Sequence, residues 1–267
     1  MKTKTLFVTL AIIALAANAF AHEYWFEPGS FFLKPGDSTP IHLYVGDGLS
    51  KDLEEREYQP DMTPMFSLFF GNGATDVRSS LAAGQTPVHK FSASEPGNYL
   101  LAMHRDWAYI TLEPEEFEAY LREDGMGYII AERRKLGETD SPGKERYSRY
   151  LKSLIQVGDA QDENFGRDAG LKLEITPDEN PYSKRLGSTL SFTVKFDGKP
   201  LAGKTVFASN RSTAKQKLRT DRNGRVRMRI NAEGLWLVHL VFMQRCASEC
   251  GEADWESFWG AYSFGVR

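Results

Sequence analysis

"RVRMRINAEGLWLVHLVFM", residues 225–243, decides the fold class of this 267-residue chain. Its first six residues alternate arginine with an apolar residue, which is typical of a β-strand with one solvated and one buried face. From 235 to 243 the segment is almost wholly apolar, as in a strand that is buried on both faces. Strand alternation then places His239 on the same face as Leu237 and Val241. The Asn223-Gly224 pair before the segment is a hairpin signal, so we expect antiparallel β structure.

Short strand patterns recur on both sides of a central interruption. In the N-terminal half, Pro-Gly and Gly-rich turns separate alternating runs, and one run places Ile41 and Leu43 on one face and His42 on the other. The C-terminal half has similar runs and closes on an aromatic strand. These spacings predict a mainly all-β protein with two β-sandwich, immunoglobulin-like domains.

The interruption has the pattern of helices. Pro114 at a first turn and Gly125 at the end delimit one expected helix, and Gly137 closes a second. A third is expected after residue 141, because Tyr147, Tyr150, Leu151 and Leu154 form an apolar stripe at helical spacing. The predicted organisation is therefore a signal peptide at 1–21, an N-terminal β-sandwich at 22–111, a helical insert of two to three helices at 112–158, and an immunoglobulin-like β-sandwich at 159–267.

The first 21 residues have the features of a secretory signal. Lys2 and Lys4 precede an apolar run, and small residues at Ala19 and Ala21 offer cleavage sites. The run is shorter than the roughly 20 residues that a membrane helix needs, so we expect removal of the leader and no membrane insertion afterwards. Removal takes the formal charge from −3 to about −5, which argues against nucleic acid as a partner. We expect a periplasmic protein.

The two cysteines, Cys246 and Cys250, lie close together in the sequence. An oxidising compartment favours a disulfide between them, which would pin a local turn because the loop is short. A soft metal site and free thiols are the alternatives.

His22 follows the expected cleavage point directly. A cut after Ala21 gives His22 a free α-amine, which forms a chelate with the imidazole Nδ1, and a further histidine would complete a three-nitrogen site. A cut after Ala19 instead places His22 third from the terminus, where the amine, two amides and the imidazole form a square-planar nitrogen set. Either end suits Cu(II) or Ni(II). The alternative is a terminal histidine that serves packing or lies at the surface.

Further ligands must come from the remaining histidines. His42 lies on the non-core face of its strand, His104 ends a core strand, and His239 lies among apolar neighbours, where a neutral imidazole needs a hydrogen-bond partner or a metal. For each, a hydrogen-bonded structural histidine is the alternative, and His89 is expected at the surface. We take His22, His42, His104 and His239 as candidate metal ligands.

Several segments are distinctive: "AHEYWFEP" (21–28), the stretch from "LEPEEFEAYLREDGM" (112–126) to "GKERYSRYLKSLIQVG" (143–158), "DGKPLAGKTV" (197–206) and "DWESFWGAYSF" (254–264). Together they resemble the domain of unknown function 4198 family of exported bacterial proteins. The resemblance implies a β-sandwich-like fold and a periplasmic step in nickel or cobalt uptake, with a membrane transporter component as partner. It implies no enzymatic activity.

The sequence contains no nucleophile elbow, zinc-protease motif, phosphate-binding loop or dinucleotide fingerprint. We therefore expect a binding protein for nickel, cobalt or copper, and not an enzyme. One alternative is an immunoglobulin-like adhesion or scaffold module that binds a glycan or peptide through exposed aromatic residues. Another is a copper enzyme with a histidine-brace site.

Overall fold

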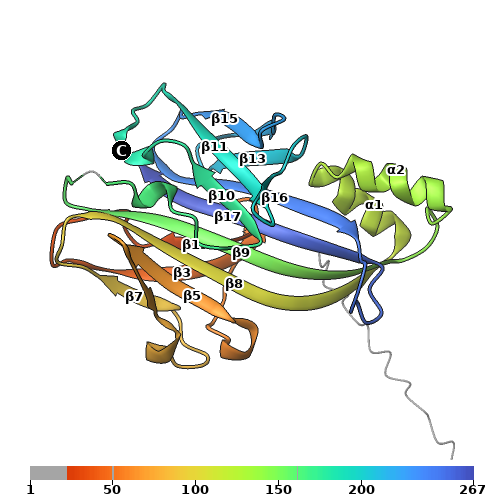
Figure 1. The fold of residues 1–267 in the computed structure, drawn as a ribbon, viewed down its shortest axis with the longest axis horizontal. Helices are drawn as coiled ribbons and strands as arrows, with labels where there is room; N and C mark the ends of the chain where they lie inside the picture. The colour runs from red at the N-terminus through yellow and green to blue at the C-terminus, as the bar shows by residue number, and fades with distance from the viewer. Residues whose placement is uncertain (1–22, 50, 161) are drawn as a thin grey trace, which may run out of the picture.

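A nine-stranded sheet, here called the large sheet, forms the centre of the molecule (Figure 1). The computed structural model describes residues 23–49, 51–160 and 162–267. Neighbouring strands pair antiparallel, with two exceptions: β9 pairs parallel with β17 and with β2. In spatial order the strands are β14 (Thr213–Arg219), β13 (Thr205–Asn210), β16 (Gly234–Arg245), β17 (Trp255–Val266), β9 (Gly143–Val157), β8 (Gly97–Leu112), β5 (Met65–Phe70) and β6 (Gly73–Asp76), with β2 (Phe32–Leu33) paired to β9.

Two four-stranded sheets pack against the large sheet. The N-terminal sheet consists of β1 (Glu23–Pro28), β3 (Ser38–Asp47), β4 (Lys51–Glu55) and β7 (His89–Ser92). The C-terminal sheet consists of β10 (Leu173–Pro177), β11 (Thr189–Phe196), β12 (Lys199–Pro200) and β15 (Arg225–Arg229). Short 3₁₀ helices lie at η1 (Pro60–Met62), η2 (Arg78–Ser80), η3 (Asn164–Gly166) and η4 (Pro181–Ser183). The predicted all-β sandwich architecture is thus confirmed.

Alternation along β16 shows how the layers are arranged. Trp236 and Val238 join the core beneath the C-terminal sheet, whereas Leu237 joins the core beneath the N-terminal sheet. Further along the strand, Val241 lies on the same face as Leu237 and packs under the helices. The C-terminal sheet therefore covers one face of the large sheet, and the N-terminal sheet and the helices cover the other. Figure 1 shows the helices at one end of the long strands β8 and β9 and the N-terminal sheet at the other.

The first two predicted helices are confirmed as α1 (Pro114–Glu123) and α2 (Gly127–Leu136). Pro114 opens α1, and Gly137 ends α2 in the left-handed conformation, at a φ of 71°. The hydroxyl of Tyr128 in α2 donates to Met243 O at 2.9 Å and accepts from Met243 N at 3.0 Å. Because these bonds reach β16, they fix the helix pair to the large sheet.

The predicted third helix is wrong, since residues 143–157 form strand β9. The stripe that suggested a helix is divided between two cores: Tyr150 and Leu154 face the C-terminal sheet, and Leu151 faces the N-terminal sheet. From Tyr150 onward every residue of β9 is buried, because both faces of this central strand are covered. The large sheet takes strands from all three predicted ranges, and the predicted domain boundaries stay a prediction.

The turn at Asn223-Gly224 exists, but the predicted hairpin does not. Strand β14 before the turn pairs with β13 in the large sheet, whereas β15 after it pairs with β11 in the C-terminal sheet. Gly224 has a φ of 72°, and an added Cβ would lie 2.4 Å from Val194 O. The glycine therefore allows the chain to cross between layers beside another backbone.

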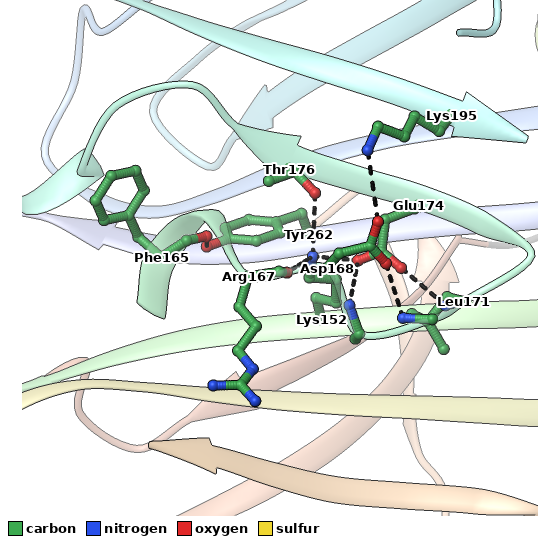
Figure 2. Close-up of polar contacts among 11 residues, drawn as sticks. Lys152, Phe165, Arg167, Asp168, Leu171, Glu174, Thr176, Lys195 and Tyr262 are labelled. Atoms are coloured by element: carbon green, nitrogen blue, oxygen red, sulfur yellow. Dashed lines mark hydrogen bonds and ion pairs between the residues drawn. The ribbon is translucent and has the colours of Figure 1, made fainter. Parts of the chain in front are cut away.

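A buried ion pair joins the C-terminal sheet to the large sheet (Figure 2). The ammonium of Lys152 in β9 donates to the carboxylate of Glu174 in β10 and, at 3.0 Å, to Arg167 O. Glu174 also accepts from Leu171 N at 2.9 Å. The two side chains are 1% and 3% exposed, so each charge depends on the other for its stabilisation.

Two further sequence features can be located. Cys246 and Cys250 are joined in a disulfide, the first of the three alternatives. Within the ranges that the structure describes, no helix is both long and apolar enough to cross a membrane.

Candidate functional site

The N-terminal sheet and helix α1 leave a space between them on the large sheet, here called the central gap. A row of four side-chain positions crosses the sheet there, because Arg105 pairs with Arg149, Arg149 with Trp259, and Trp259 with Val241. The pocket in this region, about 430 Å³ in volume, is lined by Tyr24 from the N-terminal sheet, by Tyr120 from α1 and by the first three residues of the row. It is a concave site of ordinary ligand-binding size.

His239 lies beside the start of β1 on the same face of the large sheet. Its Nε2 is 3.6 Å from Glu23 Oε1 and 3.3 Å from Ser209 Oγ. The other carboxylate oxygen of Glu23 accepts from Gly48 N at 2.9 Å, which fixes the carboxylate in place. Glu23 is the residue that follows His22, so the fold brings one histidine next to the expected mature N-terminus.

Burial determines the protonation of this cluster. It lowers the pKa of His239 to about 4, against the opposing effect of Glu23, so the imidazole is neutral at physiological pH. Burial also raises the pKa of Asp124 at the end of α1, and the charge of Glu23 adds to that shift. Lys215 Nζ lies 3.8 Å from Glu23 Oε1 and supplies positive charge.

The other histidines lie elsewhere. His104 stacks on Tyr150 on the face beneath the C-terminal sheet, with its Nε2 3.0 Å from Ser148 Oγ. His104 and His239 are therefore on opposite faces of the large sheet and cannot bind one ion. His42 Nδ1 lies 2.7 Å from Glu55 Oε1 in the N-terminal sheet. His89 is half-buried with its ring edge-on to Phe66, and not at the surface as expected.

His22 lies outside the described residues. Among the residues that are described, no three His, Cys, Asp or Glu side chains are placed to hold a metal ion together. Glu23 and His239 supply one oxygen and one imidazole, and any metal site here needs a further donor such as His22.

Sequence reasoning missed the charged lining of the pocket. Arg105 and Arg149 face the central gap from β8 and β9, and the carboxyl of Glu145 accepts from Tyr120 Oη at 3.2 Å and from Ser257 Oγ. Burial raises the pKa of Glu145 to about 7. Strand alternation would have placed Glu145 and Arg149 on the same face as Leu151, but the helical interpretation of this segment concealed that pattern.

Exposed aromatic side chains bear on the glycan-binding alternative. Tyr109, at 59% exposed, is the aromatic member of the four exposed large hydrophobic side chains among the described residues. Trp25, Trp236 and Trp255 are fully buried, and Trp259 is 8% exposed. These four tryptophans therefore pack in the cores and are not available as an exposed sugar-binding platform.

Comparisons with known proteins give the family. The model of the family described as "Domain of unknown function (DUF4198)" matches residues 19–244, and no curated protein matches. Among solved structures, the three N-terminal domains of the bacteriophage RB49 Highly Immunogenic Outer Capsid protein (Hoc) align with 92% of this chain and 71% of that chain, at 10% identity and a TM-score of 0.20. That likeness is too weak to carry an argument. Because the family match covers most of the sequence, this chain belongs to the DUF4198 family.

Proposed function

We propose that this protein is an exported, periplasmic binding protein for nickel, cobalt or copper that serves uptake by a membrane transporter, and that it is not an enzyme. The observation that carries the proposal is the 3.6 Å approach of His239 Nε2 to Glu23 Oε1, one residue from His22. Of the described histidines it is the one in contact with the start of β1.

The chemistry of these donors suits a late first-row metal. A neutral imidazole binds a metal without first losing a proton, and His239 is neutral at pH 7 because its pKa is about 4. The α-amine and imidazole of a processed His22 would add two nitrogen donors, and nitrogen-rich sets favour Cu(II) and Ni(II). Glu23, held by Gly48 N, would orient His239 or supply an oxygen.

The test is a metal titration of the protein purified from the periplasm, with its N-terminal mass determined first. We expect saturable binding of Cu(II) or Ni(II), weakened at least about tenfold in His239→Gln. His104→Gln is the matched control, because His104 lies on the opposite face, and it should bind as the wild type does. Equal affinities for the wild type and His239→Gln would refute the site.

A second variant tests the terminus itself. One alanine inserted between the cleavage site and His22 moves the free amine away from the imidazole while leaving every described residue unchanged. We expect this variant to lose affinity and to keep its melting temperature. Undiminished binding would show that the terminal chelate takes no part.

A further inference from the structure

The pocket in the central gap contains buried polar groups without partners. Arg105 is 7% exposed, and its Nη2 donates to Gln59 Oε1 at 2.7 Å, but its Nη1 has no hydrogen-bond partner among the described residues. The same holds for Arg149 Nε and for the hydroxyl of Tyr24, which is 5% exposed. Buried donors are normally satisfied, so three of them facing one pocket are available to the acceptor atoms of a ligand.

The two arginines also lack a compensating charge. Neither forms an ion pair with a carboxylate in the part of the chain that is described, whereas the buried Lys152 is paired with Glu174. The Tyr24 ring contacts both, with its centre 5.2 Å from the Arg105 guanidinium and 4.8 Å from that of Arg149. These π contacts favour the cations but leave their N–H groups free to bind an anion.

The acids around the pocket neutralise this pair only in part. Glu54 binds Arg56 at 2.5 Å at the rim, and Asp106 accepts from Trp107 N at 2.8 Å. Glu145 accepts from Tyr120 and Ser257, and burial raises its pKa to about 7 although the positive charge of Arg149 opposes that shift. The floor of the pocket beneath Tyr24 therefore carries excess positive charge.

The remaining walls are apolar. They are formed by Val45, Met62, Ala108, Ile110, Leu112 and Trp259. A volume of about 430 Å³ accommodates a small organic molecule.

We propose that the central gap binds a small organic carboxylate, whose anionic end is held by Arg105, Arg149 and the Tyr24 hydroxyl and whose apolar part packs against Trp259. Guanidinium groups suit this ligand because their planar donors match the two oxygens of a carboxylate. This site does not depend on the metal proposal, since none of these three residues is a candidate metal ligand.

Benzoate is the probe, and the neutral isostere benzamide and inorganic phosphate are its comparators. Binding to the metal-free processed protein would be followed by calorimetry and by the intrinsic tryptophan fluorescence, to which Trp259 in the pocket contributes. We expect saturable binding of benzoate and at least about tenfold weaker binding of benzamide. Equal binding of benzoate and benzamide, or saturable binding of phosphate without benzoate, would overturn the proposal.

Variants locate the anion. Arg149→Gln should weaken benzoate binding about tenfold or more, whereas Arg227→Gln, on the exposed face of β15, should leave it unchanged. Tyr24→Phe should weaken binding without lowering the melting temperature, because the hydroxyl it removes has no partner among the described residues. Should Arg149→Gln fail to fold, Tyr24→Phe alone decides. Wild-type affinity in either folded variant would contradict the site.

Discussion

At the scale of single residues, buried charges divide into those that the fold compensates and those that it does not. Lys152 has Glu174 and a carbonyl oxygen as partners, whereas Arg105 and Arg149 have π contacts and unpaired N–H groups. A compensated pair is a structural element, and removal of one member leaves an unpaired buried charge. Uncompensated charge in a pocket instead indicates a ligand.

Lys152→Met tests the compensated pair. It should lower the free energy of unfolding by about 3–5 kcal/mol, because Glu174 stays buried without its cation. The double variant Lys152→Met/Glu174→Gln should recover a large part of that loss, since an amide oxygen still accepts from Leu171 N. Urea unfolding measures both. Lys195→Met, which removes the half-exposed partner of Asp168, is the control and should cost less than about 1 kcal/mol. If the double variant loses at least as much unfolding free energy as Lys152→Met alone, Lys152 and Glu174 are not energetically coupled.

Glu145 predicts a pH dependence. Its pKa is about 7 in the folded protein and near 4.5 in the unfolded chain, so the folded state binds the extra proton between these values. The stability due to Glu145 is therefore fully present below pH 4.5 and is lost as pH rises through 7. Relative to the wild type, Glu145→Gln should gain on the order of 3 kcal/mol between pH 4.5 and pH 8. Urea unfolding of both proteins across this range gives the difference, and a pH-independent difference would contradict the assignment.

At the scale of elements, the local sequence pattern predicted the strands and helices that bury only one face. The alternation of arginine and apolar residues in β15 and the apolar stripe of α1 each correspond to one buried face. The prediction for β9 was wrong because both faces of this strand are covered, and its apolar residues match a helical spacing by chance. Only tertiary context distinguishes the two, since periodicity is uninformative for a fully buried run.

The contact between α1 and β9 gives an element-scale prediction. A Cβ added to Gly143 at the start of β9 would lie 2.1 Å from the ring of Phe117, which is fully buried in α1. Gly143→Ala should therefore displace α1 and lower the free energy of unfolding by about 1–3 kcal/mol. Gly127→Ala is the matched control, because a Cβ there meets nothing within 4 Å. If both substitutions have the same effect in thermal unfolding, the close packing at Gly143 is not important.

At the scale of the whole molecule, the large sheet joins segments that are far apart in the sequence. The sequence predicted the β architecture, the helix pair and the face of β16 that carries His239. It could not predict that Glu23 meets His239, or that Arg105 pairs with Arg149, because those contacts depend on which strands become neighbours. The local sequence pattern therefore named His239 as a candidate residue, whereas its contact with Glu23 depends on the strand order of the folded protein.

The continuity of the large sheet predicts cooperative unfolding. Because β8, β9 and β17 are adjacent central strands from different parts of the chain, we expect a single calorimetric transition whose van't Hoff and calorimetric enthalpies agree. Two separate transitions would instead indicate that the predicted ranges 22–111 and 159–267 unfold independently.

The central claim is that folding brings His239 to a metal held at the mature N-terminus. X-ray absorption spectroscopy of the copper-loaded, processed protein tests it most directly, because imidazole ligands give a characteristic multiple-scattering signal. The account predicts two imidazole ligands in the wild type and one in His239→Gln. The same imidazole count in both proteins would contradict it.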